Sequence, residues 1–127
     1  MLSENKNAKI IIVDDEKFLT ESLGIYLKKL NYNVVVAESG EEGLSLIRKN
    51  KFDIGIIDYD LGDMDGYTFL LRAELITKEL KYILISGKVN SWDEKEKVKV
   101  KNAVVLKKPF SLGDMAVSIN KLKREKR

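Results

Sequence analysis

Residues 10–16 read Ile-Ile-Ile-Val-Asp-Asp-Glu, a run of four β-branched residues that ends abruptly in three acids. An apolar run without a polar interruption is typical of a strand that helices cover on both faces, as in a parallel sheet. In an open parallel sheet, functional side chains gather where the strands end. This stretch therefore predicts an α/β fold and also indicates the edge of the sheet that carries a site.

Four further apolar runs follow along the chain, separated by longer segments. The five runs are Ile10 to Val13, Val34 to Ala37, Ile54 to Ile57, Tyr82 to Ile85 and Val104 to Leu106. This alternation predicts a doubly wound, five-stranded parallel sheet of the flavodoxin-like (βα)5 type, with helices on both faces. Because 127 residues is close to the most common domain size, we expect one domain over residues 1–127.

Helical spacing of apolar residues is clear in four of the intervening segments. The expected inward residues are Leu19, Leu23, Tyr26, Leu27 and Leu30, then Leu44, Leu46 and Ile47, then Phe69, Leu70, Ala73 and Leu75 or Ile76, and last Leu112, Met115, Ile119 and Leu122. Ser39 and Glu42 have capping-box spacing, Asp65 precedes the third helix, and Ser111 with Asp114 opens the last. The segment from Val89 to Lys101 has few apolar residues and is consistent with a short, poorly packed helix.

The composition excludes several kinds of chemistry. The chain has no cysteine and no histidine, which removes disulfides, cysteine-based zinc sites, and Ser-His or Cys-His catalysis. No apolar run is long enough to span a bilayer, and the polar first residues lack a secretory signal, so we expect a cytoplasmic protein without membrane contact. The modest net charge of +3 and a basic C-terminal helix end, which the helix dipole favours, give no reason to expect direct nucleic-acid binding.

Polar side chains follow four of the five runs. They are Asp14 and Asp15, Asp58, Ser86, and Lys108. Carboxylates in one crevice repel one another unless a cation offsets the repulsion, and Mg²⁺ is the expected ion because it needs only a few of them. An aspartate beside such a metal, with a lysine and a hydroxyl nearby, can attack phosphorus and form an acyl phosphate. Each residue alone has an ordinary explanation, such as a helix N-cap for Asp14-Asp15, but their coincidence at four strand ends favours a functional site.

The same residues lie in motifs that resemble those of the response regulator receiver domains of two-component signalling. The motifs are residues 10–16, residues 53–58 with Met64-Asp65-Gly66, residues 83–87, and residues 106–110. The resemblance covers almost the whole chain. It implies that Asp58 is the phosphoacceptor and that Asp14 and Asp15 are the acidic pair that serves magnesium.

The resemblance also implies roles for the other strand ends. Ser86 would be the switch hydroxyl, Lys108 the phosphate-binding lysine, and the backbone carbonyl of Asp60 a further metal ligand. The Lys108-Pro109 bond would be cis. A sensor histidine kinase or a phosphotransfer protein would donate the phosphoryl group, and the chain would catalyse only its own phosphotransfer and dephosphorylation. The output domain or effector, and a homodimer, are left open.

The sequence departs from the receiver pattern in three respects. Gly62 stands where the acceptor loop usually has proline, which is expected to loosen the loop. Val105 replaces an aromatic residue three before the lysine, and Asn102-Ala103-Val104 replaces the usual approach to the last strand. Because valine is short and stiff, we expect activation to change the segment from Lys88 to Lys101 instead of turning an aromatic ring.

Two other interpretations compete with this one. Asp58-Tyr59-Asp60 also fits the nucleophile motif of haloacid-dehalogenase-like phosphatases, although in that family the acidic metal pair follows the lysine, whereas Asp14-Asp15 precede the nucleophile. The second is a receiver-like binding module that has lost phosphorylation. A nucleotide-binding flavodoxin-like protein is disfavoured, because the chain has no glycine-rich phosphate loop.

Overall fold

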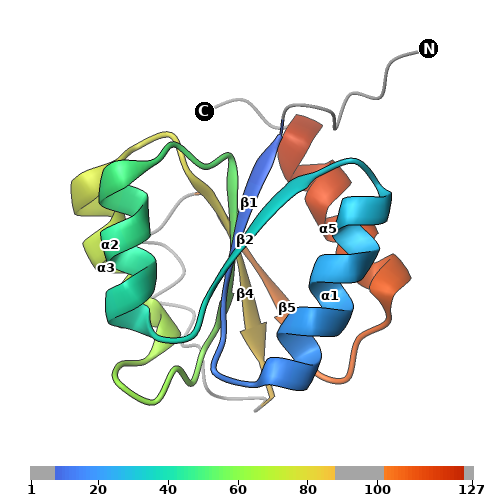
Figure 1. The fold of residues 1–127 in the computed structure, drawn as a ribbon, viewed down its shortest axis with the longest axis horizontal. Coiled ribbons are helices and arrows are strands. Elements are labelled where there is room, and N and C mark those ends of the chain that lie inside the picture. The colour runs from blue at the N-terminus through green and yellow to red at the C-terminus, as the bar shows by residue number, and fades with distance from the viewer. Residues whose placement is uncertain (1–7, 88–101, 125–127) are drawn as a thin grey trace.

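A single sheet of five parallel strands forms the centre of the protein. The computed structural model describes residues 8–87 and 102–124. The strands are β1 (Lys9–Val13), β2 (Asn33–Ala37), β3 (Ile54–Asp58), β4 (Lys81–Ser86) and β5 (Ala103–Lys107). Their order in the sheet is β2-β1-β3-β4-β5, and every neighbouring pair is parallel (Figure 1). The predicted doubly wound sheet is confirmed, and each end of every strand lies within one residue of the end of its apolar run.

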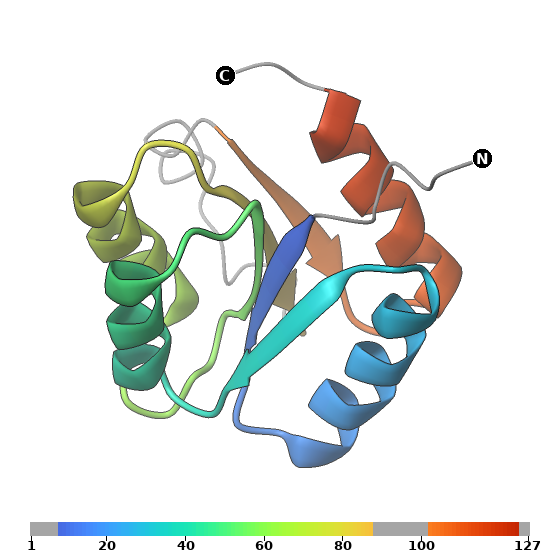
Figure 2. The ribbon, with the colours of Figure 1, turned by 45° about the horizontal axis from the view of Figure 1, so that its top comes forward.

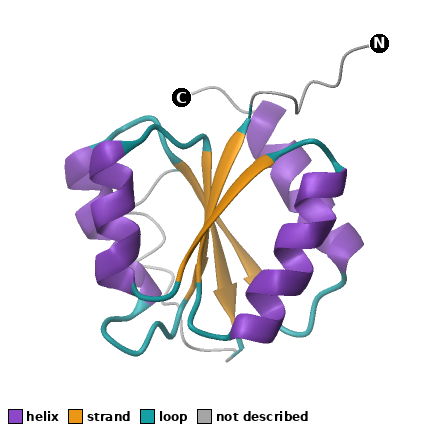
Figure 3. Ribbon diagram, viewed as in Figure 1, coloured by secondary structure: helices purple, strands orange, loops and turns teal. Residues whose placement is uncertain are grey.

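Helices cover both faces of this sheet. They are α1 (Lys17–Lys29), α2 (Gly40–Lys49), α3 (Gly66–Ile76) and α5 (Leu112–Arg124). Figures 1 and 3 show α2 and α3 on one face and α1 and α5 on the other. The tilted view in Figure 2 shows the same two layers, with β2 at the free edge beside α1. The expected helix between Val89 and Lys101 lies outside the described residues.

Alternating residues of the strands fill two apolar cores, one under each helical layer. Ile11 and Val13 of β1 pack in the core on the α2 and α3 face, whereas Ile10 and Ile12 pack in the core with residues of α1 and α5. All four of these side chains are buried. The uninterrupted apolar run of β1 therefore has the cause that the sequence suggested, since both faces of the central strand are covered.

The helix starts carry the caps expected from the sequence. The backbone N–H of Glu42 donates to Ser39 Oγ at 3.1 Å, and the N–H of Thr68 donates to Asp65 Oδ1 at 2.7 Å. At the start of α5, the N–H of Asp114 donates to Ser111 Oγ, and the N–H of Ser111 donates to the Asp114 carboxylate, both at 2.9 Å. Local hydrogen bonding thus fixes where three of the four helices begin.

Among the expected inward residues, the structure decides the choice between Leu75 and Ile76 and corrects the expectation for Leu112. In α3, Ile76 packs against the core while Leu75 is 85% exposed, because residue 76 continues the stripe of Phe69 and Ala73 and residue 75 does not. Leu112 is 40% exposed because it is the first residue of α5, where the helix has few neighbours. The rest of the α5 stripe is buried as expected.

Gly66 sets the distance between α3 and the end of β3. A β-carbon at this position would lie 2.8 Å from the carbonyl oxygen of Asp58 and 2.8 Å from the α-carbon of Tyr59. Only glycine allows the helix start to approach the strand so closely. The loop from Tyr59 to Asp65 is therefore held compactly against the end of β3.

Candidate functional site

The site lies where β1, β3, β4 and β5 end, at the lower edge of the sheet in Figure 1. Asp58 is the last residue of β3 and is in register with Ile85, so Ser86 follows directly beside it on β4. Asp14 comes directly after Val13, which is in register with Ile57. Asp14, Asp58 and Ser86 are the buried polar residues of this edge. Parallel pairing thus brings together side chains that are far apart in the sequence.

Lys108 forms an ion pair with Asp58. Its Nζ donates a hydrogen bond to Asp58 Oδ2 at 3.2 Å, and its backbone N–H donates to the carbonyl of Ser86 at 2.8 Å. Burial acts to lower the pKa of Lys108, but the charge of Asp58 and the hydrogen bond to it raise the pKa above its ordinary value. Lys108 is therefore a fixed positive charge beside the predicted phosphoacceptor. The Lys108-Pro109 bond that follows is cis, as expected.

Asp14 is a buried carboxyl group whose hydrogen bonding is incomplete. Its Oδ1 accepts a hydrogen bond from the N–H of Glu16 at 3.0 Å, while its buried Oδ2 has no hydrogen-bond partner among the described residues. Burial raises the pKa of Asp14 to about 7, with a further contribution from the negative charge of Asp58. The alternative role as a helix N-cap is wrong, because the N-cap of α1 is Glu16 and no side chain caps it.

These carboxylates fit a hard divalent cation. Asp15 is exposed and its Oδ2 lies 3.5 Å from the point where a β-carbon of Gly62 would stand, so it reaches toward the loop after β3. Within residues 8–87 and 102–124, no three acidic side chains converge into a complete cation cage. Mg²⁺ needs only one or two carboxylates, together with water and phosphate oxygens. The unpartnered Asp14 oxygen is the feature that such an ion would satisfy.

The loop after Asp58 is a closed turn. Asp60 and Asp65 form an antiparallel bridge, and the N–H of Leu61 donates to the carbonyl of Met64 at 3.1 Å. The N–H of Asp60 also donates to Asp58 Oδ1 at 3.1 Å, which ties the loop to the predicted acceptor. Gly62 has a φ of +84°, a conformation that proline cannot adopt. Glycine at position 62 therefore serves a turn that proline could not form, and the expected loosening of the loop stays a prediction.

Sequence reasoning missed two acids near the site. Glu16 Oε1 lies 3.9 Å from Lys108 Nζ, and the Asp63 carboxylate accepts hydrogen bonds from the start of α2. Glu16 stands next to the acidic pair, so proximity in the sequence was an available signal. Asp63 had no such signal, because its partners are 22 and 23 residues away.

We expect the stability of the metal-free protein to fall as pH rises, because Asp14 has a raised pKa in the folded state. A carboxyl group of this kind favours folding below its unfolded pKa of about 3.9, and this contribution is lost as pH rises through about 7. Asp14→Asn removes the titrating group and keeps the acceptor for the Glu16 N–H. It should therefore stabilise the metal-free protein at about pH 8 by on the order of 1–4 kcal/mol, and by much less at about pH 5.

Urea unfolding in the presence of a chelator measures this effect at both pH values. Asp53→Asn is a suitable control, because Asp53 lies at the opposite end of the sheet, where it accepts a hydrogen bond from the N–H of Lys9. If the free energy of unfolding changed equally with pH in the parent and in Asp14→Asn, the raised pKa of Asp14 would be contradicted.

The comparisons with known proteins agree with this geometry. The family model of the response regulator receiver domain matches residues 10–120. The chain belongs to this family. A solved structure of a CheY-like receiver domain protein from Methanospirillum hungatei JF-1 has a TM-score of 0.82 and 27% identity, covering 91% of this chain and 94% of that one. The interpretation as a haloacid-dehalogenase-like phosphatase is thereby set aside.

Curated relatives of this receiver domain are longer than the chain. The transcriptional regulatory protein GlrR of Escherichia coli K12 is 33% identical over 83 residues, which are 65% of this chain and 19% of that protein. The cell cycle response regulator CtrA of Brucella ovis is 25% identical over 116 residues, which are 91% of this chain and 50% of that protein. The chain thus spans half or less of the length of these relatives. None of the helices in the described part of the receiver domain combines the length and apolar character that a membrane crossing requires.

Membership of the family gives the general role. Receiver domains are signalling domains and not enzymes in the ordinary sense. They generally bind Mg²⁺ in an acidic pocket, and they interact with histidine kinases and output domains. In this receiver domain, Asp14, Asp58 and Lys108 are brought together at one edge, with Ser86 beside Asp58.

Proposed function

We propose that Asp58 of this receiver domain accepts a phosphoryl group from a sensor histidine kinase or a phosphotransfer protein, with Mg²⁺ bound, and thereby controls an output partner. The observation that carries the proposal is the hydrogen bond from Lys108 Nζ to Asp58 Oδ2 at 3.2 Å, beside the unpartnered oxygen of Asp14. The proposed nucleophile, the charge of Lys108 and the proposed cation site then lie together at the ends of β1, β3 and β5.

In the proposed reaction, a carboxylate oxygen of Asp58 attacks the phosphorus atom of the donor. The new oxygen–phosphorus bond forms as the bond from phosphorus to the leaving group breaks, and the leaving group keeps the electron pair. Lys108 is already within hydrogen-bond distance of Asp58. Its ammonium group can instead bind the phosphoryl oxygens as negative charge develops on them. Ser86 follows the strand residue that is in register with Asp58, from where its hydroxyl can donate to a phosphoryl oxygen.

The proposed direct ligands of the ion are the side chains of Asp15 and Asp58 and the backbone carbonyl of Asp60, and Asp14 would bind it directly or through a water molecule. When bound, Mg²⁺ offsets the charge on the transferring oxygens. The buried Oδ2 of Asp14 and the exposed carboxylate of Asp15 approach the same end of β3 from the β1 side. Asp60 is tied to Asp58 through its N–H, which fixes the orientation of the peptide that precedes the proposed carbonyl ligand.

We further propose that residues 1–127 act as one receiver domain in the cytoplasm. The signal would leave through the segment from Lys88 to Lys101, which lies outside the described residues. Val105 supports this route, because it is partly buried against the core on the α2 and α3 face and has no ring to rotate. Hydrogen-exchange protection measured with and without beryllofluoride would show whether that segment changes.

The experiment that tests the proposed function uses a small phosphodonor. The protein is incubated with phosphoramidate or acetyl phosphate, with and without Mg²⁺, and the modified residue is identified by peptide mass spectrometry. One phosphoryl group on the peptide that contains Asp58, formed only with Mg²⁺, is the expected result. Sustained turnover of p-nitrophenyl phosphate without a stable modification, or no uptake at all, would contradict the proposal.

A further inference from the structure

The tip of the acceptor loop is bound to the start of α2. Asp63 Oδ1 accepts a hydrogen bond from the N–H of Gly40 at 2.9 Å, and Oδ2 accepts one from the N–H of Glu41 at 3.0 Å. The first N–H groups of a helix have no partner within the helix, so the carboxylate satisfies two of them at once. Asp63 thus holds together two segments that are more than twenty residues apart in the sequence.

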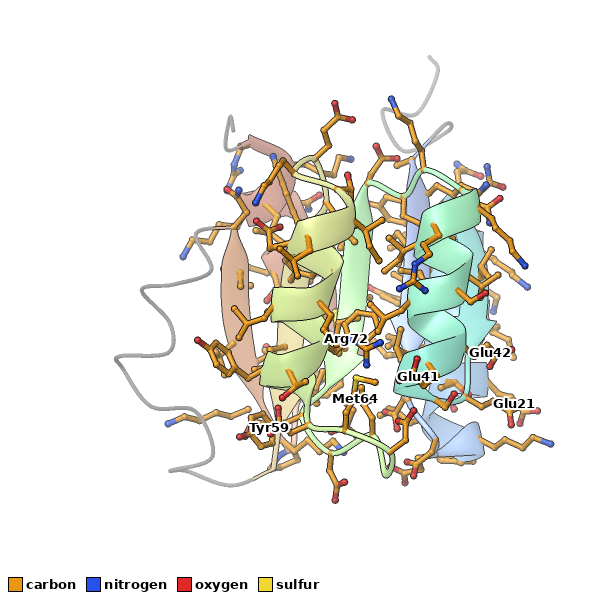
Figure 4. All side chains as sticks on the ribbon, turned by 90° about the vertical axis from the view of Figure 1, so that its left-hand side faces the viewer. Glu21, Glu41, Glu42, Tyr59, Met64 and Arg72 are labelled. Atoms are coloured by element: carbon orange, nitrogen blue, oxygen red, sulfur yellow. The ribbon has the colours of Figure 1, made fainter. Side chains whose placement is uncertain are left out.

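Side-chain packing next to Asp63 also holds the acceptor loop against the start of α2. A β-carbon on Gly40 would lie 2.7 Å from atoms of the Met64 side chain, so the loop lies directly against the helix start. From α3, Arg72 donates to both carboxylate oxygens of Glu41 at the start of α2, at 2.8 and 3.3 Å. Figure 4 shows Met64, Arg72 and Glu41 together in the seam between α2 and α3.

The other end of this loop lies in the site. The N–H of Asp60 donates to Asp58 Oδ1, and Asp60 is bridged to Asp65 across the loop. Only Leu61 and Gly62 separate Asp60 from Asp63 in the sequence. Since the turn residue Gly62 has no side chain to restrict its backbone, the position of the Asp60 peptide depends on what holds the tip.

We propose that Asp63 is a positioning residue for the phosphorylation site. By binding the start of α2 it fixes the acceptor loop, and with it the Asp60 carbonyl that the proposed function assigns to the metal. The inference rests on that proposed function for the identity of the ion. It adds that magnesium affinity is set in part by a side chain that touches neither the ion nor Asp58.

Ser39 provides a matched control. It caps the same helix, because its Oγ accepts a hydrogen bond from the N–H of Glu42 at 3.1 Å. Unlike Asp63, Ser39 directly precedes α2 in the sequence and is not part of the acceptor loop. Removal of Ser39 Oγ leaves one N–H group at the start of α2 without its side-chain partner, and removal of the Asp63 carboxylate leaves two. If the role of Asp63 were purely structural, both alanine variants would lose stability and neither would lose Mg²⁺ affinity.

The experiment compares Asp63→Ala, Asp63→Asn and Ser39→Ala with the parent chain. Isothermal titration calorimetry gives the Kd for Mg²⁺, urea unfolding gives stability, and mass spectrometry gives the rate of modification by phosphoramidate at several Mg²⁺ concentrations. We expect Asp63→Ala to weaken Mg²⁺ binding roughly threefold to tenfold, below the 10- to 100-fold typical of groups bonded directly to a metal ligand. Its modification rate should recover at saturating Mg²⁺. Asp63→Asn keeps one acceptor oxygen and should recover part of the affinity.

Ser39→Ala should lose stability while it retains the parent's Mg²⁺ affinity. Equal Mg²⁺ affinities of Asp63→Ala and Ser39→Ala would overturn the inference, and if Asp63→Ala does not fold, the comparison of Asp63→Asn with Ser39→Ala decides in the same way. Failure of the proposed function gives a different result, because the parent itself would then take up no phosphoryl group. The Mg²⁺ titrations still test the role of Asp63 in that event.

Discussion

Asp58→Asn should abolish uptake of a phosphoryl group from phosphoramidate, with a loss of at least about 10³-fold in rate, as for other lost nucleophiles. An amide oxygen is a far weaker nucleophile than a carboxylate, whereas its size and shape are nearly the same. The N–H of Asp60 and Lys108 Nζ donate to different oxygens of Asp58, so the single amide oxygen keeps an acceptor for one of them. The fold should survive the loss of the other hydrogen bond. Intact-mass measurement over time, followed by peptide mapping, gives the rate and the residue.

Asp60→Asn is the matched control for this variant. Asp60 is an aspartate in the same loop, but its proposed role belongs to the backbone carbonyl, which the substitution leaves in place. Its side chain accepts a hydrogen bond from the N–H of Gly62 at 3.2 Å, and an amide oxygen can do the same. Modification of Asp60→Asn at close to the parent's extent is therefore expected. If Asp58→Asn retained the same modification at the same occupancy, the assignment of the acceptor would be wrong.

Lys108→Ala should slow phosphorylation of Asp58 by about 10²- to 10³-fold, the range found when one group that stabilises transition-state charge is removed. The ammonium lies 3.2 Å from Asp58 Oδ2 and is partly buried, so water replaces it poorly. Its loss also leaves the charges of Asp14 and Asp58 without their nearest described cation, which should destabilise the metal-free protein. Rates are compared at saturating Mg²⁺, so that weaker metal binding does not account for the difference.

Lys107→Ala separates this effect from a general loss of positive charge. Lys107 is the preceding residue, is exposed, and ends β5 in register with Ser86. Its removal changes the net charge by the same amount and should leave the rate nearly unchanged. Equal rates for the two alanine variants would show that Lys108 has no specific part in the transfer.

The sequence predicted the fold and the edge of the site because both depend on the apolar runs of the strands and on the residues that directly follow them. The run Ile10 to Val13 required cover on both faces, and parallel strands place their ends together whatever the details of packing. Asp14, Asp58, Ser86 and Lys108 could therefore be assigned to one place without knowledge of a single contact.

Other features could not be predicted, because they depend on three-dimensional contacts or on backbone conformation. Leu75 and Ile76 are adjacent and equally apolar, and only the final rotation of α3 buries Ile76. The positive φ of Gly62 is a property of the closed turn and not of the residue type alone. The hydrogen bonds from α2 to Asp63 arise only when the loop has met the helix.

The strand order has a consequence for how the protein is made. The two strands that carry Asp14 and Asp58 are neighbours, and both are synthesised well before Lys108 leaves the ribosome. A nascent chain can thus pair β1 with β3 before Lys108, whose ammonium group is paired with Asp58 in the folded protein, has been synthesised. During that interval a proton on Asp14, or a cation from solution, would offset the repulsion between the two carboxyl groups. The ion pair between Lys108 and Asp58 can therefore form only after β5 has been synthesised.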